Sequence, residues 1–252
     1  MKVYDITNVE NALHTLTNLF SLSFKEVDKF MKLHQNVDVE AFLKEFHINL
    51  DCFELEDLQI VGIHTTTNND QCESIKKTGL INLKRALSVD SSLNNFLHEH
   101  DIYINIYTKT LTYKQQSYNL VDCGNSKLHY KIFGDYALDC FLVMQKNRKF
   151  DAKLKARPKV LSEIEKYLHI ENLHQDWINQ STPYMIKFKE HAYNFNRYHF
   201  SPDGSEDGMK YTLVHYALTV IATNQECDIQ VDLVGEYQIP VKNIIEINAV
   251  EV

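Results

Sequence analysis

A strand that leads directly into a short capped helix constrains the fold of this chain more than any other feature. Residues 58–64 form an apolar run rich in β-branched side chains, which predicts a buried strand. Asn69 or Asp70 can accept the unpaired amides of the helix that follows, and Gly79 can take the left-handed conformation just beyond its end. The sequence therefore predicts a strand, a polar turn and a short helix in close succession.

The composition is that of an ordinary globular chain. Of 252 residues, 44% are hydrophobic and 24% are charged, which is enough to bury a substantial core in one large domain or two small ones. The chain contains no G-x-x-x-x-G-K and no G-x-G-x-x-G sequence, so P-loop and Rossmann nucleotide sites lose their main support. Its net charge of −8 disfavours non-specific binding to nucleic acid.

The cysteines and the apolar runs predict a cytoplasmic protein that does not engage a membrane. The five cysteines are widely spaced and form no C-x-x-C motif, which is typical of reduced thiols in an intracellular protein. No apolar run approaches the roughly 18 residues of a membrane span. No H-E-x-x-H motif occurs, so we expect no metal site. A thiol nucleophile at Cys72 or Cys227 would need a partner histidine.

The first fifty residues are predicted to be helical. Apolar residues recur at helical spacing in residues 9–20, and Ser23 with Glu26 forms a capping box that opens a second helix. Asp38 can cap a third helix. We therefore predict an N-terminal helical lobe over residues 1–55, which could serve as an accessory or partner-binding module.

Residues 56–252 mix strands and helices without regular alternation, which favours an α+β fold over βαβ winding. Two short helices are predicted after the first strand, the second capped by Asp90, and residues 136–144 fit either a helix or a strand. Further helices are predicted over residues 158–168 and 211–222, and strands over residues 58–64, 102–107, 111–113, 117–121, 184–188, 227–233, 236–240 and 243–247.

Two stretches of the chain resemble the ADP-ribosyltransferase superfamily, which includes PARP-like and DarT-like enzymes. In that family a strand ends in His followed by Thr or Gly, and a helix then runs to an I-x-x-x-G-L ending. Here His64-Thr65 is followed by Ile75-Lys76-Lys77-Thr78-Gly79-Leu80, and Ile239-Pro240 resembles the closing "I-P-x-x-x-I" segment. The resemblance covers roughly residues 58–85 and 220–248. It implies a pair of split β-sheets with a nucleotide cleft, within residues 56–252.

The resemblance also implies a set of site residues that bind NAD. His64 would bind a ribose hydroxyl. Its neighbour Thr65, at a position often held by Gly, would contribute main-chain groups to the site. A late glutamate on a strand would act as the catalytic acid. Glu226 opens a predicted strand after a polar turn and is the preferred candidate. Glu236 is the second candidate, because its spacing to Pro240 is short for the catalytic position.

An aromatic side chain would stack on nicotinamide, and two candidates lie between His64 and the late glutamates. Tyr184 belongs to a predicted strand. Tyr193 begins a cluster, residues 193–200, in which Asn and Arg alternate with aromatic residues, a pattern that suits stacking on a planar ring. Most of the other aromatic residues are expected to belong to the core.

The function implied by the resemblance is NAD-dependent transfer of ADP-ribose to a macromolecular acceptor, protein or nucleic acid, as in bacterial toxins and phage defence or counter-defence. Such an enzyme works mainly by positioning and electrostatics, because the nicotinamide–ribose bond breaks with oxocarbenium character. One alternative is an inactive protein that binds a nucleotide or a partner on the same scaffold. A relative of RNA 2′-phosphotransferases ranks lower, since no basic residue follows His64 until Lys76.

Overall fold

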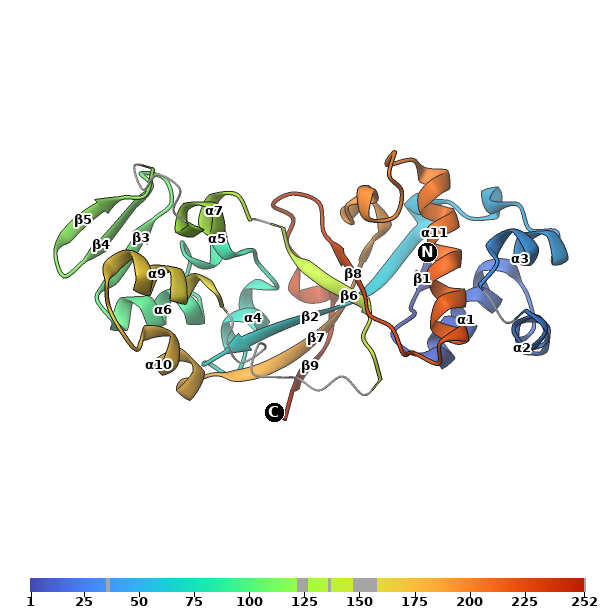
Figure 1. Cartoon of the computed structure of the whole chain (residues 1–252), viewed down its shortest axis with the longest axis horizontal. Coiled ribbons are helices and arrows are strands. Elements are labelled where there is room, and N and C mark those ends of the chain that lie inside the picture. Colours follow the sequence, from blue (N-terminus) through green and yellow to red (C-terminus); the bar gives the residue numbers. More distant parts are fainter. Residues whose placement is uncertain (35–36, 122–126, 136, 147–157, 252) are drawn as a thin grey trace. The chain divides into compact units, whose positions relative to one another are not determined.

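The protein is a mixed structure of helices and mainly antiparallel sheets (Figure 1). The computed structural model describes residues 1–34, 37–121, 127–135, 137–146 and 158–251. The chain divides into two compact units, each built from three separate segments. Unit 1 comprises Met1–His64, Asp139–Arg148 and Lys187–Val234, and unit 2 comprises Thr65–Leu138, Lys149–Ile186 and Gly235–Val252. The mixture of helices and mainly antiparallel sheets agrees with the predicted α+β class.

Three helices open unit 1, as the sequence predicts: α1 (Val9–Phe20), α2 (Phe24–Leu33) and α3 (Val39–Glu45). Ser23 and Glu26 form the capping box at the start of α2, and the Asp38 side chain accepts a hydrogen bond from the Ala41 amide at the start of α3. Buried apolar faces hold the helices together, with the rings of Phe30 and Phe42 packed edge to face.

The predicted boundary between residues 1–55 and 56–252 is not where the compact units divide. Residues 1–55 lie in unit 1 together with α11 (Glu206–Ala222), and α1 packs directly against α11. The buried hydroxyl of Tyr4 also donates a hydrogen bond to the Leu213 carbonyl, at 2.8 Å. The reason is that α11 buries residues along its whole length, from Met209 to Val220, and the N-terminal helices pack against it.

The main sheet has the strand order β8-β6-β2-β7-β9, and the short strand β1 pairs in parallel with the start of β2. Its strands are β1 (Lys2–Tyr4), β2 (Leu58–Asn68), β6 (Asp139–Val143), β7 (Thr182–His191), β8 (Ile229–Asp232) and β9 (Ile244–Ala249). The long strands β2 and β7 each pass through both units (Figure 1). In unit 1, β6 pairs antiparallel with β2 through Ile63 and Phe141, and with β8 through Asp139 and Asp232.

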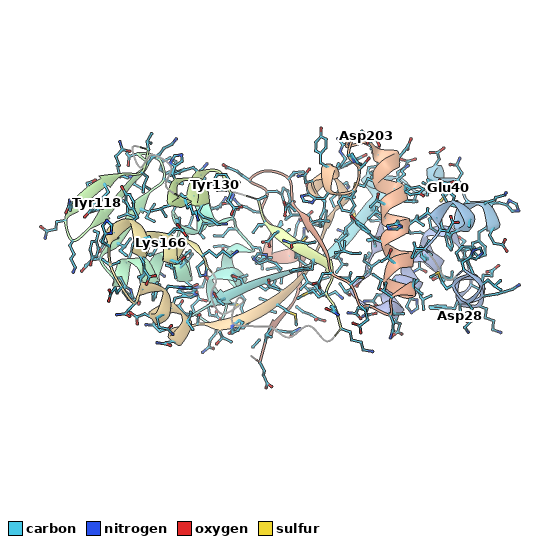
Figure 2. The ribbon with its side chains drawn as sticks, in the orientation of Figure 1. Asp28, Glu40, Tyr118, Tyr130, Lys166 and Asp203 are labelled. Carbon is cyan, nitrogen blue, oxygen red and sulfur yellow. The ribbon has the colours of Figure 1, made fainter. Side chains whose placement is uncertain are left out.

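Unit 2 contains a second sheet, a three-stranded meander of β3, β4 and β5. Its elements are β3 (Ile102–Asn105), β4 (Thr110–Tyr113), β5 (Gln116–Asn119), α4 (Glu73–Thr78), α5 (Leu83–Ala86), α6 (Ser92–Glu99), α7 (Lys127–Phe133), α9 (Val160–Leu168) and α10 (Leu173–Gln180). They enclose a core that includes Phe96 and Trp177, whose indole nitrogen donates a hydrogen bond to Thr67 of β2 at 2.8 Å. Lys166 of α9 is exposed, whereas Tyr118 of β5 is partly buried and packs against this core (Figure 2).

Five one-turn 3-10 helices complete the described structure: Leu50–Cys52, Leu55–Asp57, Ala192–Asn194, Arg197–His199 and Val241–Asn243. Within the residues that the structure describes, no helix has both the length and the apolar character needed to cross a membrane.

Most predicted elements are confirmed, but the sequence did not predict β1 or α10, and several other details differ. The apolar run at residues 136–144, which fitted either a helix or a strand, contains strand β6 at residues 139–143. The predicted strand 236–240 is reduced to a single bridge at Ile239. Helix α6 is capped by Ser91 rather than by Asp90, because the Ser91 hydroxyl accepts the Asn94 amide while Asp90 accepts a side-chain amide of Asn95.

The glycine that ends α4 lies directly against the backbone of Ile239. Gly79 has a φ of 81°, a conformation that L side chains rarely adopt, and a β-carbon there would collide with the carbonyl oxygen of Ile239. Leu80 and Ile239 form an antiparallel bridge at this point, with hydrogen bonds of 3.0 and 2.9 Å. The contact leaves no room for a side chain.

We predict that Gly79→Ala lowers the free energy of unfolding by about 3 kcal/mol, because it adds a steric collision to backbone strain. Gly235→Ala is the matched control, since Gly235 also has a positive φ but has no atom within 4 Å of an added β-carbon. It should lose only about 1 kcal/mol from strain. Urea unfolding of both variants measures the difference, and equal losses would show that the approach to Ile239 is not tight.

Candidate functional site

His64 lies within β2 rather than at its end. The strand continues to Asn68, so the expectation that it ends at His64 is wrong. The reason is that Thr65, Thr66 and Thr67 are β-branched residues that favour extended backbone, and Thr65 and Thr67 are buried in the sheet. His64 is thus held on a rigid strand and not on a loop.

The His64 imidazole is oriented by the first residue of β6. Its Nδ1 lies 2.7 Å from the main-chain oxygen of Asp139. A carbonyl oxygen only accepts hydrogen bonds, so Nδ1 carries the proton in this contact. Nε2 makes no hydrogen bond to any described residue, and the side chain is 14% exposed. His64 therefore presents one nitrogen that can accept a hydrogen bond from a ligand hydroxyl.

Two aspartates beside His64 form a feature that the sequence alone did not reveal. Asp139 and Asp232 face each other across β6 and β8, and His199 Nε2 lies 3.0 Å from Asp232 Oδ2. Like charges at directly opposed positions destabilise a sheet. Here the His199 ring and the Gln230 amide, which donates to Asp139 at 3.1 Å, offset that repulsion. Only the strand register brings these residues together, so spacing in the sequence carried no signal.

These acid–imidazole contacts do not form a metal site. Within the described ranges, no group of three or more His, Cys, Asp or Glu side chains is arranged to hold a metal ion. The buried thiol of Cys140 lies nearby, and its pKa is raised well above the usual value, mainly by burial and then by Asp139 and Asp232. Cys140 is therefore a protonated core residue at neutral pH.

Glu226 lies at the opposite end of β6 from His64. The Gln145 side-chain amide donates to Glu226 Oε2 at 2.8 Å, and the Gln145 main-chain amide donates to Asp228 at 2.9 Å. His64 contacts Asp139, the first residue of β6, whereas Gln145 follows its last residue, Val143, and a five-residue strand is roughly 13 Å long. The structure therefore does not bring the preferred acid to His64.

Glu236 belongs to unit 2, next to the segments that carry the family resemblance. It forms an ion pair with Lys84, Nζ to Oε1 2.6 Å, and its side chain is exposed. Nearby, the Leu80–Ile239 bridge joins the Gly79-Leu80 ending to the Ile239-Pro240 segment. Two motifs that lie far apart in the sequence are thus adjacent in space within one unit.

Thr65 and Tyr184, both predicted to bind the cofactor, lie in unit 2. Thr65 is buried, which suits a residue that would act only through its backbone. Tyr184 is partly buried near Cys72 and Lys76, and its pKa is raised, first by burial and then by the Cys72 thiol. The neighbouring Asp70 has one buried carboxylate oxygen, Oδ1, that forms no hydrogen bond.

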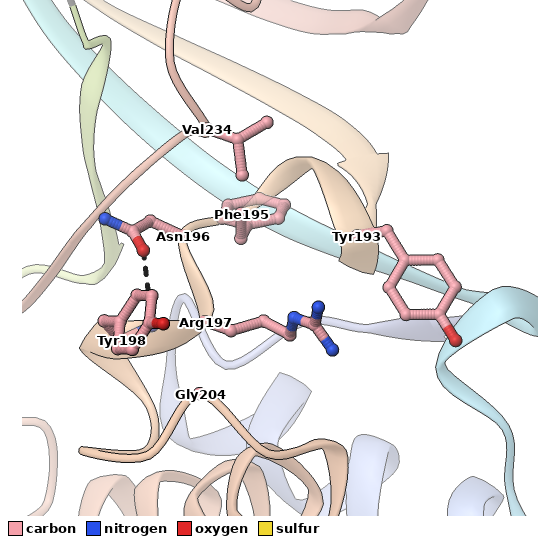
Figure 3. A pocket seen from close by; sticks show the side chains of 7 residues that line it. All are labelled: Tyr193, Phe195, Asn196, Arg197, Tyr198, Gly204 and Val234. Atoms are coloured by element: carbon pink, nitrogen blue, oxygen red, sulfur yellow. Dashed lines mark hydrogen bonds between the residues drawn. The ribbon is translucent and has the colours of Figure 1, made fainter.

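A hollow of about 500 Å³ opens in unit 1 beside the aromatic cluster that the sequence singled out. Its lining residues are Tyr193, Phe195, Asn196, Arg197, Tyr198, Gly204 and Val234 (Figure 3). The cluster is fixed to the chain after β8, because the Asn196 amide donates to the Asp232 carbonyl and the Val234 amide to the Asn194 carbonyl, each at 2.8 Å. Of the six predicted site residues, Tyr193 lines this hollow, whereas His64, Thr65, Tyr184, Glu226 and Glu236 do not.

Comparison of the chain with protein-family models, with curated proteins and with solved structures found no match. The candidate site therefore rests on its own residues and contacts.

Cys72, one of the two thiols considered as nucleophiles, is poorly suited to that role. Its side chain is buried, and burial together with the Asp70 carboxylate raises its pKa to about 12. A nucleophilic cysteine needs a depressed pKa, since the thiolate is the reactive form. The four described cysteines, which leave out Cys123, form no disulfide.

We predict that iodoacetamide at pH 8 alkylates Cys52 much faster than Cys72 in the folded protein. Cys52 is exposed, whereas the thiolate of Cys72 is scarce at this pH because its pKa is about 12. Peptide mass spectrometry over a time course measures both rates, and urea-unfolded protein serves as the control in which the two should react alike. Equal rates in the folded state would contradict the burial of Cys72.

Proposed function

We propose that this chain is an NAD-dependent ADP-ribosyltransferase that modifies a macromolecular acceptor, protein or nucleic acid. The observation that carries the proposal is the bridge between Leu80 and Ile239. It joins the Gly79-Leu80 ending of the first resembling segment to the Ile239-Pro240 part of the second, within unit 2. A chance resemblance of two short segments gives no reason for them to pair.

His64 fits the ribose-binding role in the proposal. Its Nδ1 is engaged by the Asp139 carbonyl, so in the neutral ring Nε2 can accept a hydrogen bond from a ribose hydroxyl. NAD, when bound, supplies the bond that breaks between nicotinamide and ribose. The protein then contributes position and charge rather than a covalent intermediate.

Glu236, and not Glu226, is the acid in the proposal. Glu226 is held by Gln145 at the far end of β6 from the His64–Asp139 contact. Glu236 lies in the segment that also contributes Ile239, and it is exposed to solvent apart from its pair with Lys84. This assignment reverses the preference drawn from the sequence.

We predict that Glu236→Gln lowers NAD-dependent labelling of acceptor by about 100-fold, the usual effect of removing one electrostatic contact to a transition state. His64→Ala should lower it similarly. Labelling is measured with adenylate-radiolabelled NAD and lysate from a cell that expresses the protein, with release of nicotinamide as a second readout.

Glu226→Gln is the matched control for this experiment, because it makes the same chemical change at an exposed late glutamate. It should label acceptor within about twofold of the unmodified protein, and thermal unfolding of all variants excludes loss of fold. Loss of activity in Glu226→Gln with retention in Glu236→Gln would overturn the assignment of the acid. Binding of NAD without nicotinamide release would instead favour an inactive nucleotide-binding protein.

A further inference from the structure

We infer that the hollow in unit 1 is a separate binding site for a mononucleotide, with its base between Tyr193 and Tyr198 and its phosphate at Arg197. The inference does not rest on the proposed function, since neither His64 nor Glu236 lines the hollow. It rests on the arrangement of the seven lining residues in Figure 3.

The two tyrosine rings are held in place although they are exposed. The Tyr193 hydroxyl donates to Glu206 Oε1 at 3.2 Å. Tyr198 is 72% exposed, yet its main-chain amide donates to Asn196 Oδ1 at 3.2 Å and its ring packs over Gly204. An aromatic ring that is exposed but fixed offers a ready surface for stacking, because little conformational freedom is lost when a ligand binds.

The residues that line the hollow include several hydrogen-bond donors, from the Asn196 amide, the Tyr198 hydroxyl and the Arg197 guanidinium. The side-chain amide nitrogen of Asn196 and the hydroxyl of Tyr198 have no partner among the described residues. Arg197 is engaged only through Nη1, 3.4 Å from Glu206, which leaves its other N–H groups available. The Glu206 carboxylate contacts Tyr193 and Arg197, but it is not among the described residues that line the hollow. This donor set fits a ligand with an anionic group, and the guanidinium suits a phosphate in particular.

Size and charge point to a mononucleotide. A hollow of about 500 Å³ falls in the usual range for small-molecule sites. Buried Phe195 and the partly exposed Val234 give it an apolar side against which a planar base can pack. A net charge of −8 opposes a long polyanion, whereas one phosphate needs only a local positive group. The ligand class is therefore a base joined to a phosphate by a sugar.

Calorimetric titration of the full chain with AMP, adenosine and ribose 5-phosphate tests this inference. AMP should bind most tightly, because it alone carries both the ring and the phosphate. Tyr198→Ala should weaken AMP binding about 10-fold through lost stacking. Arg197→Gln should weaken AMP binding by a similar factor and leave adenosine binding unchanged, since only AMP presents a phosphate.

Tyr107→Ala is the control, since Tyr107 is 88% exposed and does not line the hollow, and it should bind AMP normally. Gly204→Ala adds a second test, because a β-carbon there would lie 3.1 Å from the Tyr198 ring and displace it. Absence of AMP binding, or AMP affinity in Tyr198→Ala and Arg197→Gln equal to that of the unmodified protein, would overturn the inference. Glu236→Gln should still bind AMP, so failure of the proposed enzyme activity is distinguishable from failure of this site.

Discussion

Strand β2 is the constraint on which the rest of the structure depends. Its 11 residues are largely buried, so segments from several parts of the chain must return to cover it. In unit 1 it pairs with β1 and β6, and in unit 2 its Thr67 and Asn68 bond to Trp177 and Ser92. A buried strand cannot leave these polar groups unpaired. The hydrogen bonds at the polar end of β2 therefore fix the positions of α10 and α6 in unit 2.

Local signals in the sequence predicted the elements well. The capping box at Ser23 and Glu26 placed the start of α2, because the two side chains satisfy amides within one turn of the chain. The positive φ of Gly79 followed from its place after α4, although its ψ of −168° lies outside the predicted left-handed helical region. The extension of β2 beyond His64 did not follow from local pattern, because polar threonines there resemble a turn until the buried sheet around them is known.

The candidate site was only partly predictable, since it depends on strand register. His64 and the aromatic cluster at residues 193–200 stood out by residue type, and the cluster does line a hollow. The opposition of Asp139 and Asp232 depends on how β6 pairs with β8, which no spacing along the chain encodes. The contacts of Glu226 and His64 lie at opposite ends of β6, and order along the chain carries no sign of that separation.

The Lys84–Glu236 ion pair is compatible with a catalytic role for Glu236. Both side chains are solvent-accessible, and an exposed pair of this kind contributes only about 0–1 kcal/mol. A ribose hydroxyl that donates to the Glu236 carboxylate could therefore displace Lys84 at little cost, or share the carboxylate with it, since each of its two oxygens accepts more than one hydrogen bond. Lys84 would then stay beside the acid while a carboxylate oxygen of Glu236 contacts the ribose, where its negative charge can stabilise a cationic ribose.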